Sequence, residues 1–459
     1  MVFKINRKIS LGYLILFCEL LFLLKINLDS SYKIWAIISL CQLVLNLFVI
    51  WKMSNTRVFS FISFFIILNA IFYCGHIYML GFNFEGDLNL NFTYYGDSIA
   101  RIGAFKYYLY SQLLLVFGIL SCDEFSKRNK NKSITIIDMK RSSKLLIILG
   151  VIPRLYIDIL KLIGGFSSGY EGVYSIYIPQ FIYTVAFFFD LGVIIALLQL
   201  GKTRKGKILF LGILFYKCLS MITGARQENV GFLIIWIFIY FFLIRKVNVG
   251  SIIKFIFIFI IGIALIGTIS TTRANGSFTL EKMYSFIWGS DVNSILGNFL
   301  GEFGSCFSSL VVPFQQIPSK VTYGLGKSYI AGLLSIIPYL VSKFSLFANQ
   351  TTYISLFKGT TFFGGSMLGE SYYNFGWCGL IIVFIIGYIA KKIDLQLINK
   401  TYRDYCPLKY IMAFVLSVSM LIFIRGYFTD MVQKIIWVYI LLKFLNRNNS
   451  RFLLKNKGK

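Results

Sequence analysis

Long apolar runs recur along the whole chain of 459 residues, and they constrain its fold more than any other feature. Runs of about 17–25 apolar residues have the length that an α-helix needs to cross a bilayer. Hydrophobic residues make up 57% of the chain and charged residues only 14%, which leaves too little polar surface for a soluble domain of this length. The sequence therefore predicts an all-α, polytopic integral membrane protein.

The apolar runs predict about twelve transmembrane helices. Their expected ranges are 9–25, 32–51, 58–81, 106–121, 145–163, 178–199, 208–223, 228–244, 254–270, 376–390, 409–424 and 431–446. We therefore divide the chain into a membrane domain of about nine spans (1–270), a long loop (271–375), and a membrane domain of about three spans with a tail (376–459).

Two stretches of the long loop show interrupted apolar patterns, at about 281–314 and 329–347. Both are too broken to be assigned as spans. We expect helices that lie along the outer membrane interface there, and a partly re-entrant course is the alternative.

Positive charge is distributed unevenly between the two faces of the predicted membrane domain. The chain carries 46 Lys and Arg and a net charge of +27. Most of these cations fall at the termini and in alternate connectors, above all in 122–144. Cytoplasmic loops carry such an excess, so both termini are predicted in the cytoplasm and the long loop outside. The same bias explains the basic composition without nucleic acid, which we do not expect as a partner.

Several kinds of chemistry lack their usual sequence signals. The eight cysteines are scattered without a CxxC pair, and His76 is the only histidine. This disfavours a disulfide framework, a two-histidine metal site and histidine-centred catalysis. A phosphate-binding GxxxxGK[ST] loop is also missing, so we expect no metal, cofactor or nucleotide to take part.

Three arginines lie at predicted outer ends of spans, against the charge bias: Arg226, Arg273 and Arg425. Each has glycine or another small residue beside it. A guanidinium group binds phosphate oxygens with two parallel hydrogen bonds, so one hypothesis is a lipid pyrophosphate site. Snorkelling to the interface or a structural ion pair is the alternative for each of them.

Glu370 lies a few residues before the tenth predicted span, within a stretch rich in Gly, Tyr and Asn. A carboxylate near a low-dielectric boundary can have a raised pKa and serve as a general base. It can equally cap a helix or pair with an arginine. The residues by themselves leave both interpretations open.

Ionisable residues also fall inside predicted spans. Arg154 and Asp158 are four positions apart, which predicts an ion pair on one helix face. Asp190 and Lys217 are candidate partners between the sixth and seventh spans. Such groups face a bundle interior, and a proton relay in a transporter is the functional alternative. His76 is expected to be a packed polar residue near the outer end of the third span.

Four pieces of sequence carry a family resemblance. They are Thr223–Arg226; Tyr323–Tyr329 followed by Ile337 and Pro338; Gly365–Gly376; and Ile424–Gly426 with Asp430. Together with the number of spans and the position of the loop, they resemble Wzy-type O-antigen polymerases, which join lipid-linked oligosaccharide repeat units. The resemblance covers most of the chain.

The resemblance implies a GT-C-like membrane glycosyltransferase of the bacterial inner membrane, acting at its periplasmic face. Growing glycan would pass from undecaprenyl pyrophosphate to a new lipid-linked repeat unit. Glu370 would be the general base, and Arg273 would act with it on the leaving pyrophosphate. The residues implied to bind pyrophosphate or sugar are Arg226, Arg425, Tyr372, Tyr373 and Asn374. A chain-length regulator is an implied partner protein.

Two alternatives remain open from the sequence. A flippase for the same lipid-linked sugar also needs many spans and cations near lipid phosphates, but it has little use for a loop of this length. An O-antigen ligase shares the general plan and often uses a histidine in the outer loop. The loop 271–375 contains no histidine, which favours polymerase over ligase.

Overall fold

The computed structural model describes residues 7–86, 97–125, 139–221, 226–244, 250, 253, 291–398 and 407–456, apart from positions 27, 29, 30, 55, 338, 348 and 360–362. Every regular element within these residues is a helix. The predicted all-α class is confirmed.

Helices occupy the predicted span ranges, apart from 254–270, which lies outside the described residues. They are α1 (Arg7–Lys25), α2 (Tyr32–Met53), α3 (Phe61–Gly81), α5 (Ser98–Phe125), α6 (Met139–Ser175), α7 (Gln180–Leu200), α8 (Arg204–Met221), α9 (Arg226–Phe238) continued by the π-helical η2 (Ile239–Ile244), α16 (Leu380–Ile398), α18 (Pro407–Phe423) and α19 (Phe428–Asn456).

Four of these helices are long and apolar enough by length and composition to cross a membrane. They contain the segments Tyr32–Met53, Phe61–Gly81, Ser98–Cys122 and Phe181–Leu200. The protein is therefore a multi-pass membrane protein. The full count of twelve spans and the GT-C-like architecture stay predictions.

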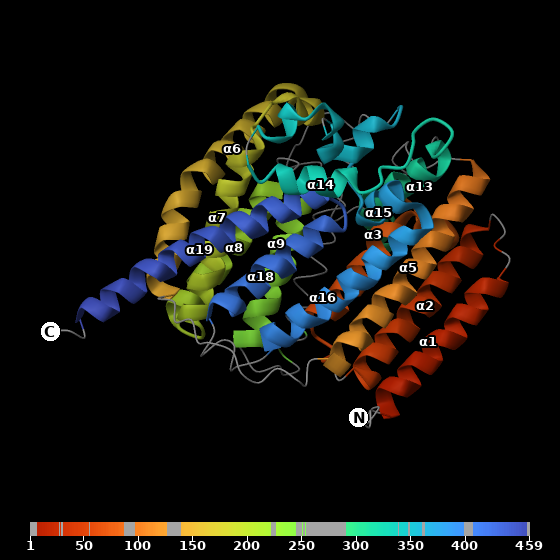
Figure 1. Ribbon diagram of the computed structural model, residues 1–459, viewed down its shortest axis with the longest axis horizontal. Helices are drawn as coiled ribbons and strands as arrows, with labels where there is room; N and C mark the ends of the chain where they lie inside the picture. Colours follow the sequence, from red (N-terminus) through yellow and green to blue (C-terminus); the bar gives the residue numbers. More distant parts are fainter. Residues whose placement is uncertain are drawn as a thin grey trace.

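The helices form two groups, with short elements over one end (Figure 1). In one group α5 packs on α16 and on α1, and α2 packs on α3; in the other α6 packs on α7, and α18 packs on α9 and α19. The elements α13, α14 and α15 lie over the end of the bundle that is away from the start of α1 and the end of α19. The two predicted cytoplasmic ends and the predicted outer loop are thus at opposite ends of the bundle.

Glycines allow α5 and α16 to approach closely. A Cβ atom at Gly118 would strike the backbone of Phe384, and one at Gly387 would strike the backbone of Leu115. Small residues at such crossings permit the tight backbone contact that holds helices together in membranes, where lipid offers little hydrophobic drive for association.

Two buried ion pairs lie in the helix group that contains α6 and α7, and both were predicted. Arg154 Nε is 3.1 Å from Asp158 Oδ2 within α6. Lys217 Nζ on α8 is 2.5 Å from Asp190 Oδ1 on α7, which confirms the partnership between these two helices. His76 is also buried as predicted, with Nε2 at 2.7 Å from the carbonyl oxygen of Gly301.

The long loop contains helices that pack into the bundle as well as short elements over its end. Its elements are α12 (Val292–Gly304), α13 (Cys306–Gln316), α14 (Lys327–Leu334), η3 (Val341–Lys343), η4 (Ser345–Phe347), η5 (Gln350–Leu356), α15 (Met367–Phe375) and η6 (Gly376–Gly379). α12 packs on α3, and α13 packs on α5 and α15. The pair α12–α13 bends by 42°, and it has the length and composition of a broken span or a re-entrant loop. This agrees with the re-entrant alternative.

Candidate functional site

Glu370 is placed by a short, almost fully buried helix, α15. Ser366 caps the start of this helix, and its side chain accepts a hydrogen bond from the backbone N–H of Gly369 at 3.0 Å. Serine at this position satisfies an N–H group that has no partner within the helix. The hydroxyl of Tyr73 on α3 lies 2.9 Å from Ser366 Oγ and fixes the start of α15 against the bundle. α15 precedes α16 and is not one of the candidate spans.

The carboxylate of Glu370 is 1% exposed and lies between two other segments. Its Oε1 accepts a hydrogen bond of 2.6 Å from Ser328 Oγ on α14. Its Oε2 accepts one of 2.9 Å from the backbone N–H of Phe428, the first residue of α19. The Glu370 side chain therefore joins α14, α15 and α19. It caps the start of α19, and capping a helix is one of the roles that the sequence left open for this residue.

Burial raises the pKa of the Glu370 carboxyl from 4.5 to about 7, because the charged form loses its hydration. The hydrogen bonds from Ser328 and Phe428 lower this pKa, and the nearby Asp430 raises it. A carboxyl with a pKa near 7 can exchange a proton at neutral pH, which is the property that general-base catalysis needs.

Asn374 completes the network one turn along α15. Its side-chain nitrogen donates to Ser328 Oγ at 2.7 Å and to the backbone oxygen of Glu370 at 2.8 Å. The backbone N–H groups of Gly324 and Leu325 donate to the carbonyl oxygens of Tyr373 and Asn374, both at 2.9 Å. The segment 324–328 therefore lies along α15 and covers its polar face.

The two tyrosines predicted to contact substrate are packed among other aromatic rings. Tyr372 stacks on Phe314 with ring centroids 3.7 Å apart. Tyr373 stacks on Tyr353 at 5.6 Å, and its hydroxyl donates to Gln350 Oε1 at 2.8 Å. Both rings thus form part of the wall around Glu370, with 6% and 2% of their surface exposed.

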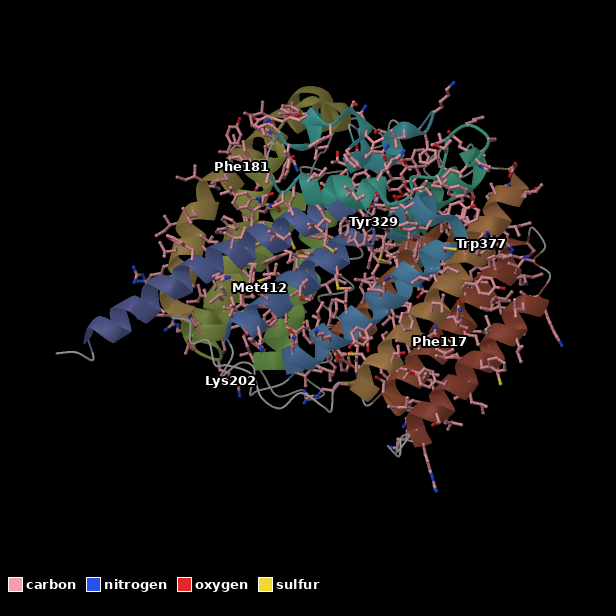
Figure 2. The ribbon with its side chains drawn as sticks, viewed as in Figure 1. Phe117, Phe181, Lys202, Tyr329, Trp377 and Met412 are labelled. Carbon is pink, nitrogen blue, oxygen red and sulfur yellow. The ribbon has the colours of Figure 1, made fainter. Side chains whose placement is uncertain are left out.

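Tyr329, which is labelled in Figure 2, brings further aromatic contacts to the same region. The ring of Tyr329 lies edge-on to Phe428 at 4.9 Å and stacks on Phe375 at 6.1 Å. Burial and the nearby Glu370 raise the pKa of the Tyr329 hydroxyl well above its ordinary value. This hydroxyl therefore stays protonated wherever Glu370 can titrate.

Arg425 lies in the turn between α18 and α19, and this turn is in direct contact with the start of α15. The backbone N–H of Met367 donates to the carbonyl oxygen of Ile424 at 3.3 Å. Gly365 packs on Gly426 so closely that a Cβ atom would lie 2.5 Å from the Gly426 oxygen. The two motif pieces, far apart in sequence, therefore form one surface.

The guanidinium group of Arg425 points to the end of α12. Its Nη1 donates to the backbone oxygen of Glu302 at 3.1 Å. Glu302 lies in the last turn of α12, where backbone carbonyls have no partner within the helix and attract a cation. His76 contacts Gly301 in that same turn. Arg425 is half-buried, so it is held in position while part of its surface remains accessible.

The other two arginines are only partly accounted for by the structure. Arg226 is the first residue of α9, but its side chain lies outside the described part of the protein. Arg273 falls in 254–290, which is also outside the described residues. The structure therefore brings together the segments of Glu370 and Arg425, and the placement of Arg226 and Arg273 beside them stays a prediction.

Ser328 was not among the predicted site residues, although it lies in the mid-loop motif quoted above. Its hydroxyl accepts from Asn374 and donates to Glu370, and it is fully buried. The sequence signal that could have identified Ser328 is its position directly after a glycine and a lysine within that motif. Within the described residues, no group of three or more His, Cys, Asp or Glu is arranged to hold a metal ion.

Comparison with known proteins agrees with the motif pieces that this geometry brings together. Residues 5–446 match a family described as O-antigen polysaccharide polymerase Wzy, so the match spans nearly the whole chain. Searches of curated proteins and of solved structures gave no match. A match of this extent includes every segment of the site around Glu370. The chain therefore belongs to the Wzy family of O-antigen polysaccharide polymerases.

Proposed function

We propose that the protein polymerises oligosaccharide repeat units linked to undecaprenyl pyrophosphate at the periplasmic face of the bacterial inner membrane. The growing glycan moves from its own lipid to a newly delivered lipid-linked unit. The observation that carries this proposal is a buried carboxyl, Glu370, held by hydrogen bonds from α14 and from the start of α19 in a chain of the Wzy family.

In the proposed reaction, Glu370 accepts the proton of the acceptor sugar hydroxyl. The oxygen of that hydroxyl forms a bond to the anomeric carbon of the donor glycan. The bond from this carbon to the pyrophosphate oxygen breaks, and its electron pair leaves with the lipid pyrophosphate. The energy of the sugar–pyrophosphate bond drives the transfer, so neither a metal nor a nucleotide takes part in this scheme.

The Ser328 hydroxyl marks where the acceptor hydroxyl would bind. It donates to Glu370 Oε1 at 2.6 Å, which is the contact that a general base must make with the proton it removes. An acceptor that reaches Glu370 must take this place, so segment 324–328 has to move away from α15. Its displacement would also uncover Asn374, Tyr372 and Tyr373, our candidates for contacts to sugar.

The proposed role of the arginines is to bind pyrophosphate and to stabilise the charge that develops on it. Arg425 is held by Glu302 beside the Glu370 segment. Arg226 begins α9, and Arg273 opens the long loop. We propose that both join Arg425 at one anionic group, because guanidinium groups pair with phosphate oxygens at two points.

The test is a reconstituted polymerisation assay with purified protein and its lipid-linked repeat unit. Wild type should produce a ladder of chain lengths, and both Glu370→Gln and Arg273→Ala should abolish it. Glu85→Gln, at an exposed carboxylate, is the matched control and should keep the full ladder. A full ladder from both Glu370→Gln and Arg273→Ala would overturn the assignment.

A further inference from the structure

The side-chain oxygen of Asn374 has no hydrogen-bond partner among the described residues. The nitrogen of the same amide, Nδ2, donates to the backbone oxygen of Glu370 at 2.8 Å. A carbonyl oxygen can only accept, so this contact fixes which way the amide points. Asn374 is fully buried. A buried acceptor without a partner is unfavourable, and in a native site it calls for an explanation.

A second polar atom without a partner lies in the same region. The hydroxyl of Tyr329 on α14 is buried, and none of the residues that the structure describes forms a hydrogen bond with it. The Glu370 carboxylate is near enough to contribute to the raised pKa of this hydroxyl. Two such atoms beside the proposed base indicate a place for a polar ligand.

The hydroxyl of Ser328 shows how a sugar hydroxyl would be bound there. It accepts a hydrogen bond from Asn374 Nδ2 at 2.7 Å and donates one to Glu370 Oε1 at 2.6 Å. An acceptor hydroxyl that replaces Ser328 would make the same two bonds, one to the amide and one to the base. Asn374 Oδ1 belongs to the same planar amide, so it would lie beside the group that holds the reacting oxygen.

The segment 324–328 covers Asn374 Oδ1 as well as Glu370. A Cβ atom at Gly324 would lie 2.9 Å from Asn374 Oδ1 and 2.5 Å from the ring of Tyr373. The backbone of this glycine therefore fills the space in front of both groups. The proposed function already requires the segment to move away from α15. That movement would uncover the amide oxygen and the carboxylate together.

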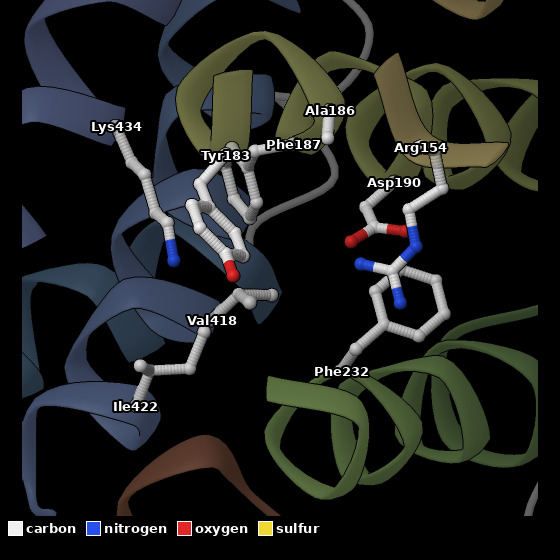
Figure 3. A pocket seen from close by; sticks show the side chains of 9 residues that line it. All are labelled: Arg154, Tyr183, Ala186, Phe187, Asp190, Phe232, Val418, Ile422 and Lys434. Carbon is white, nitrogen blue, oxygen red and sulfur yellow. The ribbon is translucent and has the colours of Figure 1, made fainter. Parts of the chain in front are cut away.

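A polar pocket elsewhere in the bundle is too small for a sugar. It lies between α6, α7, α9, α18 and α19, and Arg154 and Asp190 are among the residues that line it (Figure 3). Its cavity of about 10 Å³ has room for about one water molecule. Arg154 is paired with Asp158, and Asp190 with Lys217. Its walls are helices of the bundle, whereas a loop segment covers the groups around Glu370.

We infer that the acceptor sugar carries a hydrogen-bond donor, in the simplest case a free hydroxyl, on the carbon next to the hydroxyl that reacts. The inference rests on the proposed function, in which the reacting hydroxyl bonds to Glu370. Asn374 Nδ2 donates to the reacting oxygen, and Oδ1 accepts the hydrogen of the neighbouring group. An amide offers a donor and an acceptor side by side, and two hydroxyls on adjacent carbons offer the matching acceptor and donor. Asn374 is thus a specificity-determining residue that selects a vicinal diol.

Single-transfer kinetics with synthetic acceptors test the inference on the full-length protein in nanodiscs. The linkage in the wild-type polymer first identifies the reacting hydroxyl. An acceptor unit on undecaprenyl pyrophosphate is then made with hydrogen in place of the neighbouring donor group. Wild type should lose about tenfold or more in kcat/KM on this deoxy acceptor, because Asn374 Oδ1 is left buried and unpaired. Removal of an electron-withdrawing oxygen does not weaken the remaining hydroxyl as a nucleophile, so such a loss reports the missing contact.

Asn374→Ala provides the matched comparison. This variant lacks the amide, so it should be slower than wild type on both acceptors and should no longer distinguish them. Its kcat/KM values for the natural and the deoxy acceptor should agree within about twofold, as a double-mutant cycle requires. A merely structural role of Asn374 would lower both values and keep the wild-type ratio. Thermal unfolding checks that the variant is folded; if it is not, the ratio measured on wild type decides by itself.

Equal use of the two acceptors by wild type would overturn the inference. A polymer whose linkage leaves no donor group on the neighbouring carbon would overturn it too. A wild-type ratio preserved in folded Asn374→Ala would show that Asn374 does not make the selection.

Glu370→Gln keeps the proposed function and this inference distinguishable. Full activity of that variant on both acceptors would remove the general base and with it the proposed function. An inactive Glu370→Gln together with a wild type that does not distinguish the acceptors would reject the vicinal donor alone.

Discussion

The Glu370 side chain combines two roles that compete for the same oxygen atoms. It caps α19 through Phe428 and joins α14 through Ser328, so both carboxylate oxygens are occupied. A general base needs one oxygen for its substrate. The bond to Ser328 is the one that a sugar hydroxyl can replace, whereas the bond to a backbone N–H keeps the carboxylate oriented during proton transfer.

The raised pKa of Glu370 predicts a loss of stability as pH rises. The folded protein holds the carboxyl proton up to about pH 7, but the unfolded chain releases it near 4.5. The stabilisation that the protonated Glu370 gives the folded state is fully present below pH 4.5. It declines as pH rises from there and is lost once pH passes about 7. At most it amounts to about 3 kcal/mol. Melting temperatures at pH 5 and pH 8 should therefore differ more for wild type than for Glu370→Gln. An equal difference would contradict the raised pKa.

Ser328 offers a test of the base through pH dependence. Its hydrogen bond lowers the pKa of Glu370, so Ser328→Ala should raise that pKa further. The kcat/KM of wild type reports the free enzyme, in which Ser328 still bonds to Glu370, and it should increase with pH around 7 as the base ionises; this increase should move to higher pH in Ser328→Ala. Ser335→Ala, whose hydroxyl bonds to Gly332 on the same helix, should keep the wild-type profile.

At the scale of elements, the site depends on how closely α15 approaches the turn between α18 and α19. This contact brings together residues about sixty positions apart, and it is made by backbone atoms. The hydrogen bond from Met367 to Ile424 and the packing of Gly365 on Gly426 set the distance. At Gly365 there is no space for a side chain larger than hydrogen.

Gly365→Ala should separate α15 from that turn and reduce polymerisation by about tenfold or more, because the new Cβ would lie 2.5 Å from a backbone oxygen. Gly364→Ala is the matched control, since its Cβ would meet only the Arg425 oxygen at an ordinary 3.8 Å. Comparable activity in the two variants would mean that the backbone contact does not position Glu370.

The helices were largely predictable from the sequence, but most of the side-chain contacts between them were not. The expected span 178–199 corresponds to α7 at Gln180–Leu200, because apolar length decides where a membrane helix lies. The hydrogen bonds from Ser328 and Phe428 to Glu370 join segments far apart in the sequence, and the hydrophobic pattern of the chain does not predict such contacts. The pair Asp190 and Lys217 was predictable, because a buried charge within a span requires a partner.

At the scale of the whole molecule, the structure places the short loop elements and the predicted cytoplasmic ends at opposite ends of the bundle. The distribution of Lys and Arg predicts which end faces the cytoplasm. Arg226 and Arg273 belong to this scale too. The side chain of Arg226 and all of 254–290 lie outside the described residues, so their meeting with Arg425 stays a proposal.

Cysteine labelling tests the orientation. In a variant without the native cysteines, a cysteine at Ser319 should react with a membrane-impermeant maleimide added to intact spheroplasts. A cysteine at Lys202 should react only after the membrane is permeabilised. Both positions are exposed, so access to the reagent depends on the side of the membrane alone. The reverse pattern would invert the topology and remove the site from the periplasmic face.

The single histidine gives the molecule a built-in spectroscopic reporter. His76 bridges α3 and α12, and because the Gly301 oxygen can only accept, Nε2 carries the hydrogen. Arg425 bonds to the next residue of α12, Glu302. Nitrogen-15 labelling of histidine alone yields side-chain signals from the two ring nitrogens of this one residue, at the point where α12 meets the Arg425 turn. Any movement of α12 as lipid-linked glycan arrives would then be recorded without altering a residue of the chain.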